Sequence, residues 1–254
     1  MRISTHAGLP RDDNGALVGF VGVVGADGVI YAIWNDGSTI AFTESHDGSK
    51  TFSPSRSVID VAPPYFGGAG GIPGIPRVMG FPQIGVDSSD GNRRGTLYLT
   101  WSDYRNGDVD AFISKSSDHG RTWSAAARVN NDPIHDGIDQ FFQWMTVDPV
   151  NGDIYVQFYD RRDDPANRKT GFTLARSTDG GSTFANYRWS DTSFETAQAF
   201  LGDYTWLAAY NGKVYGIWTD ALPPESSSAP PQFARPPRPG TAVRVGFADF
   251  SSRK

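Results

Sequence analysis

Three arginines in this sequence of 254 residues stand where they could bind an anionic ligand. Arg105 follows the run TrpSerAsp (101–103), and Arg161 and Arg162 directly follow PheTyrAsp (158–160). A planar guanidinium group binds a carboxylate or a phosphate through two parallel hydrogen bonds. The sequence therefore predicts a site for a small anionic ligand, with these three arginines as binding residues.

Polar side chains also precede two apolar runs. Asp139 and Gln140 stand before the aromatic run 141–144, and Asp203 and Tyr204 stand before ThrTrpLeu (205–207). Carboxylate, amide and phenol groups at such positions could contact the same ligand from the side opposite the arginines. Whether these residues meet depends on the elements that carry them.

A nine-residue pattern organises the chain and predicts those elements. It reads Gly, any residue, aliphatic, Tyr, two variable positions, Trp or Phe, any residue, Asp. The four copies are GVIYAIWND (28–36), GTLYLTWSD (95–103), GDIYVQFYD (152–160) and GKVYGIWTD (212–220). Alternating apolar residues on both faces predict strands packed on both sides, and the glycine before each strand indicates a hairpin turn. A pattern recurring at this period indicates a repeat architecture.

Composition favours an all-β fold in one domain. The chain holds 29 Gly and 17 Pro, 13% of its residues are aromatic, and we find no long stretch with helical periodicity. We predict a single β-propeller domain over 1–254, built from four-stranded antiparallel blades at about 17–61, 80–131, 140–191 and 200–250. Residues 1–5 are expected to form an outer closing strand beside the last blade.

Charge, cysteine content and hydropathy exclude other classes. The net charge of −5 argues against a nucleic-acid partner. The chain has no cysteine, and hence neither a disulfide framework nor a thiolate metal site. No apolar run is long enough to span a membrane as a helix. We expect no cofactor, although calcium is left open because its oxygen ligands leave no spacing signature.

An octet comes after the third strand of three repeats and carries a family resemblance. It occurs as SHDGSKTF (45–52), SSDHGRTW (116–123) and STDGGSTF (177–184). The pattern resembles the Asp-box, or BNR repeat, of sialidases and related β-propellers. Its physical reason is a hairpin, in which Asp47, Asp118 and Asp179 accept hydrogen bonds from amides of their own turn. The Trp123 ring is expected to pack against its blade, which makes these four residues structural.

The topology of a meander places the candidate ligand site on the rim opposite these octets. The connections between the second and third strands, together with the segments leading into each inner strand, form that rim. It should gather Arg77 and the residues named above around the mouth of the central channel. The linkers 63–76 and 221–240 are candidates for a roof over it. The resemblance implies a ring of six blades, so the four visible blades would form either a closed ring of their own or part of a six-bladed one.

Two kinds of function are compatible with these patterns. The resemblance to sialidases implies a glycoside hydrolase with Tyr204, or alternatively Tyr104, as nucleophile and with Asp139 or Asp203 as acid and base. It further implies that Arg105, Arg161 and Arg162 bind a sialic acid carboxylate, near Gln140. The alternative is a non-catalytic propeller that binds a glycan or a protein, or a structural fragment of a larger secreted protein. A secreted or periplasmic location is implied by the resemblance alone.

Overall fold

The structure is a computed structural model. It describes residues 1–10, 16–62, 71–75, 77–78, 80–196, 199–224 and 239–251. Over these ranges the chain forms strands, turns and bends and contains no helix. A helix long and apolar enough to cross a membrane is accordingly not found in the part described.

The strands form four antiparallel sheets, each a meander in chain order. The first sheet holds β1 (Leu17–Val24), β2 (Ile30–Asp36), β3 (Thr39–Ser45) and β4 (Arg56–Asp60). The second holds β5 (Gln83–Val86), β6 (Leu97–Asp103), β7 (Asp110–Ser116) and β8 (Ala127–Arg128). The third holds β9 (Gln140–Val147), β10 (Ile154–Asp160), β11 (Lys169–Ser177) and β12 (Ala185–Arg188), and β13 (Phe194–Glu195) pairs with the start of β11. The fourth holds β14 (Trp206–Tyr210), β15 (Lys213–Pro224) and β16 (Pro239–Asp249).

The nine-residue repeat forms the second strand of every sheet, as predicted. Its copies are β2, β6, β10 and β15, and each is preceded by a glycine with φ between 71° and 84°. Such a positive φ is accessible to glycine without steric cost, which explains why the repeat begins with this residue. The all-β propeller predicted from the repeat is confirmed, with one sheet for each blade.

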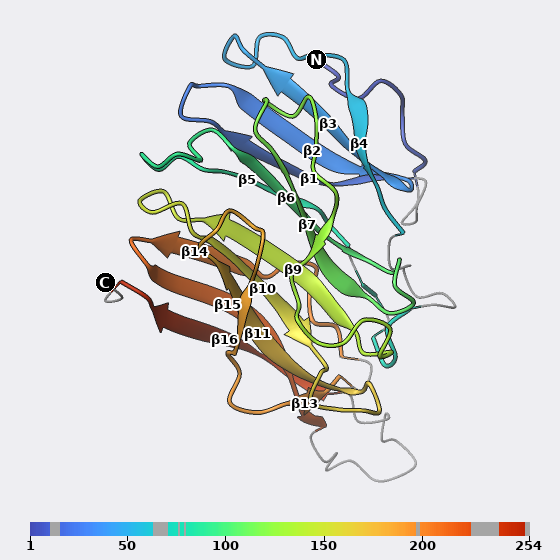
Figure 1. The fold of residues 1–254 in the computed structure, drawn as a ribbon. Helices are drawn as coiled ribbons and strands as arrows, with labels where there is room; N and C mark the ends of the chain where they lie inside the picture. Colours follow the sequence, from blue (N-terminus) through green and yellow to red (C-terminus); the bar gives the residue numbers. More distant parts are fainter. Residues whose placement is uncertain are drawn as a thin grey trace.

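The blades stack on one another through their apolar faces. Between the first two blades, Ile33 and Phe42 pack in one buried cluster with Leu99 and Trp101. Comparable clusters join the second blade to the third and the third blade to the fourth. The inner strands β1, β5, β9 and β14 contact one another in that order. Figure 1 shows the result as a series of sheets from the first, at the N-terminal end, to the fourth, at the C-terminal end.

The expected closing strand is not formed. Residues 1–10 adopt no strand, and the fourth sheet contains only β14, β15 and β16 among the described residues. Instead, the Thr5 amide donates to Ser55 Oγ (3.2 Å) and His6 Nε2 lies 3.1 Å from Asp36 Oδ1, so this segment lies along the first blade. The first and fourth blades lie at opposite ends of the arc in Figure 1. The prediction for residues 1–5 was wrong, because Thr5 and His6 instead contact the first blade, which follows them directly in the sequence.

Candidate functional site

The three octet hairpins use their carboxylates within their own turns. Asp118 accepts hydrogen bonds from the Thr122 amide (2.9 Å) and hydroxyl (2.6 Å) and from Ser116 Oγ (2.7 Å). Asp47 and Asp179 repeat this arrangement with Thr51 and Thr183. These hydrogen bonds lower the pKa of Asp118, because they stabilise the charged carboxylate.

Trp123 lies between two blades. Its Nε1 donates to the Gly120 carbonyl (3.1 Å), and its ring meets Phe42 of the preceding blade edge-on at 5.9 Å. The octets therefore stabilise turns and blade contacts, and the hydrogen bonds that their Asp side chains accept all lie within the same turn.

A different group of side chains lies beside the inner strands. We call it the channel cluster, and it consists of Arg77, Phe81, Trp144, Asp203, Tyr204 and Trp206. Arg77 and Phe81 lead into β5, Asp203 and Tyr204 lead into β14, and Trp144 lies on β9. The β1 strand approaches as well, because a Cβ atom on Gly19 would lie 2.5 Å from the Phe81 ring. All four inner strands thus contribute to the surroundings of this cluster.

The channel cluster combines an ion pair with exposed aromatic rings. Arg77 Nε lies 3.3 Å from Asp203 Oδ1, and both side chains are partly exposed. The Tyr204 ring is 68% exposed and contacts Phe81 (centroids 6.0 Å apart) and Trp144 (6.2 Å). Trp206, which is 60% exposed, lies 5.3 Å from Trp144. A ligand can therefore reach aromatic faces, a phenol, a carboxylate and a guanidinium at one place.

Arg105 folds back onto its own blade. Its Nη2 lies 2.5 Å from Asp103 Oδ2 and also donates to the Asp60 carbonyl (2.9 Å). Its guanidinium stacks over the Trp101 and Phe112 rings, at 5.5 and 4.8 Å from their centroids. The side chain is only about one-third exposed, so most of its binding capacity is used within the second blade.

Arg161 is fully buried and anchors the backbone of two segments. It donates to the carbonyls of Pro73 (2.9 Å) and Asn167 (2.5 Å) and to Thr170 Oγ1 (3.0 Å). Burial lowers its pKa to about 10. Asp139 is buried in the same region, where it accepts hydrogen bonds from the Val109 amide (3.0 Å) and Asn167 Nδ2 (2.6 Å), and burial raises its pKa. Both side chains form hydrogen bonds that hold separate loop segments together, and both are buried away from any ligand.

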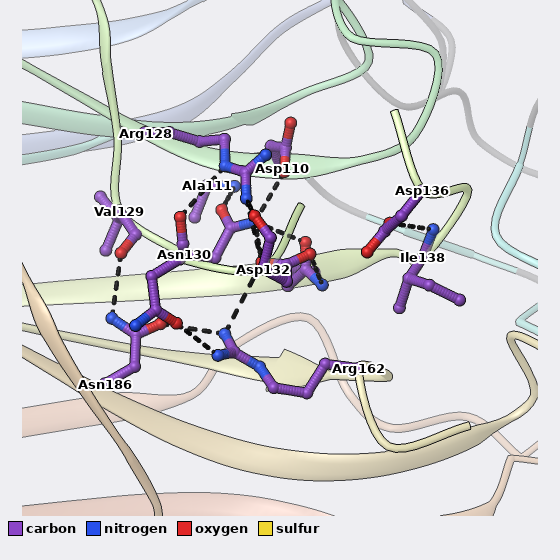
Figure 2. A network of polar contacts seen from close by, with 12 residues as sticks. Asp110, Ala111, Arg128, Val129, Asn130, Asp132, Asp136, Ile138, Arg162 and Asn186 are labelled. Atoms are coloured by element: carbon purple, nitrogen blue, oxygen red, sulfur yellow. Dashed lines mark hydrogen bonds and ion pairs between the residues drawn. The ribbon is translucent and has the colours of Figure 1, made fainter. Parts of the chain in front are cut away.

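Arg162 belongs to a polar network between the second and third blades (Figure 2), which Gln140 joins through Asp132. Arg162 Nε donates to Asp160 Oδ2 (2.5 Å), and its two terminal nitrogens reach Asn131 and Asn186. Gln140 Nε2 donates to Asp132 Oδ2 (3.1 Å). Burial raises the pKa of Asp160 despite its arginine partner.

A small hollow borders this network on the third blade. It holds about 220 Å³ and is lined by polar and aromatic groups that include Arg162, Arg188 and Phe172. Arg188 forms an ion pair with Asp163 there. Because both arginines already have acidic partners, the hollow offers no free positive charge to an anion.

The predicted site is therefore divided among four places. Asp203 and Tyr204 lie together in the channel cluster. Arg161 and Asp139 lie in the interior, Arg162 and Gln140 in the network between the second and third blades, and Arg105 on the second blade. In the described part of the chain, no hydrogen bond or ion pair joins the three arginines to Asp203 or Tyr204. The roles assigned to these residues stay predictions, but their convergence on one ligand is not observed.

Sequence reasoning overlooked the aromatic part of the cluster. Phe81 stands two residues before β5, Trp144 in the middle of β9 and Trp206 at the start of β14. Aromatic residues recurring in or just before three successive inner strands are the signal that could have identified them. Among the described residues, no group of three or more His, Cys, Asp or Glu side chains is arranged to hold a metal ion.

Comparisons with known proteins identify the architecture. No family model matches the chain, and no curated protein matches it. An α-L-arabinofuranosidase from Fusarium graminearum, solved with an iminosugar inhibitor, matches at a TM-score of 0.54 and 15% identity, over 91% of this chain and 62% of its own. A Hadza microbial sialidase matches at 0.51 and 14%, over 80% and 42%, and an endo-arabinase from Bacteroides thetaiotaomicron at 0.50 and 13%, over 86% and 73%.

These structural neighbours are propeller-type glycoside hydrolases, but the likeness extends only to the fold. Identities of 13–15% are too low to transfer a catalytic residue. The chain spans about three-fifths of the length of the arabinofuranosidase and about two-fifths of that of the sialidase. Function must therefore be argued from the side chains of the channel cluster.

Proposed function

We propose that the protein binds a glycan at the channel cluster. The observation that carries this proposal is the exposed Tyr204 ring, which contacts Trp144 as Trp206 does and directly follows Asp203 of the Arg77–Asp203 ion pair. Sugar rings present C–H groups on their faces and hydroxyl groups around their edges. Aromatic side chains contact the former at low cost in conformational entropy, and charged groups bind the latter by hydrogen bonds.

The Arg77–Asp203 ion pair offers two kinds of polar contact to a sugar. Arg77 can donate hydrogen bonds to a carboxylate or to hydroxyl groups, and Asp203 can accept them from hydroxyl groups. The neighbours in fold include a sialidase, an arabinofuranosidase and an endo-arabinase. Sialic acid carries a carboxylate and arabinose does not, so a comparison of acidic with neutral glycans tests the contribution of Arg77.

The binding test is calorimetry or a glycan array with sialosides, uronic acid oligomers and arabinan fragments. Tyr204→Ala should lower the affinity for the bound glycan by about tenfold, which corresponds to roughly 1.4 kcal/mol. Tyr210→Ala is the matched control, because Tyr210 is also 68% exposed on the fourth blade but lies outside the cluster. Equal losses in both variants, or no binding of any glycan by the unmodified chain, would refute the proposal.

Hydrolysis of a glycosidic bond is the second candidate function. Asp203 and Tyr204 are adjacent in sequence at the start of an inner strand, so that a phenol and a carboxylate can reach one bound sugar. A tyrosine nucleophile beside a carboxylate that transfers protons is a known alternative to the usual pair of carboxylates in glycosidases. This role rests on the proposed glycan binding.

Activity is tested separately with fluorogenic exo-glycosides, including a sialoside and an arabinofuranoside. If the chain is an enzyme, Tyr204→Phe should abolish turnover while largely keeping glycan affinity, because the aromatic ring remains. Asp203→Asn should also reduce turnover. Glycan binding without turnover on any substrate would leave the binding function and exclude the enzymatic one.

A further inference from the structure

The fourth blade exposes an apolar sheet face of unusual extent. We call it the open face, and it consists of Tyr210, Tyr215, Ile217, Val243, Val245 and Phe247. Their exposed fractions lie between 43% and 72%. Ladder partners lie on the same side of a sheet, and Tyr215 faces Phe247 and Ile217 faces Val245 across the β15–β16 ladder. The alternate residues of β15, such as Val214 and Trp218, are buried against the third blade.

The repeat identifies the open face as an uncovered blade interface. Tyr215 occupies the same position of the nine-residue pattern as Tyr31, Tyr98 and Tyr155, which are 0–1% exposed. Each of those three is covered by the following blade. Tyr31 bonds to His119 Nδ1 (2.7 Å), Tyr98 lies against the hairpin at Gly180 and Gly181, and Tyr155 stacks on Phe250 (5.8 Å). Tyr215 is 52% exposed, so the open face is built like a blade interface, but no described strand packs against it.

The first blade of another copy is a poor match for this face. In the second and third blades, the hairpin that meets the preceding blade carries Gly120 or Gly181 at the point of contact. A Cβ atom at Gly120 would lie 2.4 Å from the Phe42 ring. The first blade has Ser49 at the corresponding position, at a φ of 68°. Its outer residues Ala32, Trp34, Ala41 and Thr43 are at most 4% exposed, so it presents no comparable apolar face.

We propose that the open face docks against the open face of a second copy of this chain, giving a two-fold symmetric dimer. A two-fold interface needs only one kind of patch, which pairs with itself, and the fourth blade provides one. Sheets commonly pack face to face at a spacing of about 10 Å with interdigitating side chains. The second copy would thus cover Tyr215 and Phe247 as the following blade covers the equivalent residues elsewhere.

The exposed area and the charge distribution of the open face are compatible with a second copy of the chain as its partner. At roughly half to two-thirds exposure, the six side chains present on the order of 600 Å² of apolar surface, which gives about 1,200 Å² for two copies. That total is near the lower limit for specific interfaces. The only charged residues of β15 and β16 on this side, Lys213 and Asp249, are ladder partners at one end of the face. Two copies can therefore approach without burying an unpaired charge in the middle.

The test is the mass of the 254-residue chain in solution, measured by light scattering and sedimentation over a range of concentrations. The unmodified chain should form dimers and no larger species, because a two-fold interface is closed. Val245→Lys should raise the dissociation constant by at least about a hundredfold, since symmetry places the new charge in the interface twice. Val24→Lys is the matched control, a valine with 60% exposure on the inner strand of the first blade.

A second measurement locates the contact without weakening it. The chain contains no cysteine, so Val245→Cys introduces a single thiol into the open face. A short bifunctional maleimide should then link two copies, whereas Val24→Cys should give no covalent dimer. Circular dichroism should show the same fold in all four variants, because each substitution is at an exposed strand position.

Three outcomes would overturn the proposal. A single-chain mass at every concentration would mean that the open face takes another occupant, such as a blade from a different polypeptide. Dissociation by Val24→Lys as well as by Val245→Lys would indicate head-to-tail contact between first and fourth blades. Assemblies larger than dimers would exclude a closed two-fold interface.

Discussion

The first and the fourth blade each have one sheet face that no neighbouring blade covers, and the two faces differ in how much of their side chains is exposed. In the first blade, Ala32, Trp34, Ala41 and Thr43 lie on that face, and all four are at most 4% exposed. Residues 1–10 run along this blade, with Thr5 against Ser55 and the backbone of Gly8 beside Leu17. In the fourth blade the face without a neighbouring blade is the open face, which is the opposite side of the repeat pattern, the side of Tyr215. Among the described residues, one end of the arc is therefore covered and the other is exposed.

A repeated residue therefore acquires its role from the blade next to it. Tyr31 and Tyr215 hold the same position in the pattern, yet only Tyr31 has a neighbouring blade against it. Desolvation raises the pKa of Tyr31 to about 12, with a contribution from the nearby Asp27 carboxylate. The sequence repeat determines the strand, and the neighbouring blade determines whether its tyrosine stabilises the fold.

The largest expected effect is the difference between Tyr31→Ala and Tyr215→Ala. Removing the buried Tyr31 ring leaves a cavity between blades and should lower the free energy of unfolding by about 3–5 kcal/mol. Tyr215→Ala should cost less than about 1 kcal/mol in the monomer, because the ring is already half exposed. Urea denaturation at low protein concentration measures both. Similar losses in the two variants would mean that the open face is covered in solution even in the monomer.

A smaller effect is expected at the hairpin glycine of the second blade. Gly120→Ala should lower the free energy of unfolding by about 2–4 kcal/mol, because φ is 78° there and the added Cβ would overlap the Phe42 ring. The reverse change at the corresponding point of the first blade, Ser49→Gly, should be stabilising by about 0.5 kcal/mol, since it relieves a positive φ. Thermal unfolding of the two variants checks the opposite signs. Destabilisation by Ser49→Gly would show that the serine side chain makes a needed contact.

The fold was predictable from the sequence because its signals are local. The nine-residue pattern combines a turn glycine, alternating apolar residues and a closing aspartate, and each of these acts within one strand and its hairpin. The closing strand was not predictable in the same way. Its only signal was that ArgIleSer (2–4) resembles ArgValAsn (128–130) and ArgTrpSer (188–190), which follow the third strands of their blades. The partner of the segment depended on contacts that three residues do not encode.

The candidate site was predictable only in part. Strand topology placed Asp203 and Tyr204 correctly at the start of an inner strand. It could not show where long arginine side chains turn, and Arg105 and Arg162 each bond an aspartate two residues earlier, Asp103 and Asp160. This Asp-any-Arg spacing is visible in the sequence and indicates local ion pairs. The burial of Arg161 depends on Pro73, which lies far away in the chain.

Removal of residues 1–8 tests whether the first end is closed by its own N-terminal segment. The truncated chain should lose about 2 kcal/mol of unfolding free energy, because apolar area on the first blade becomes exposed. It should also bind an apolar dye more strongly than the full chain. Unchanged stability and dye binding would mean that Trp34 is covered by other parts of the chain. A comparison with Val245→Lys shows whether the new surface associates as the open face does.

The smallest expected effect is on the pH dependence of stability. It can be compared between a turn carboxylate of the first blade and one of the fourth blade. Hydrogen bonds from Thr51 lower the pKa of Asp47 in the first blade, and hydrogen bonds from Ser251 lower the pKa of Asp249 at the end of β16. A carboxyl group with a lowered folded pKa binds fewer protons in the folded than in the unfolded state. Its contribution is therefore fully present above the unfolded pKa of about 4 and is lost as the pH falls below it.

Asp47→Asn should accordingly flatten the decline of stability below pH 4, and Asp249→Asn should do the same to a similar extent. Buried Asp160 has a raised pKa, so its contribution has the opposite sign, and Asp160→Asn should instead reduce the loss of stability on going from acid to neutral pH. Unfolding curves recorded at pH steps from 2 to 7 separate the two directions. If Asp47→Asn flattens the decline of stability below pH 4 and Asp249→Asn does not, the turn after β16 is not formed in solution. That result is expected if the fourth blade frays at its uncovered edge.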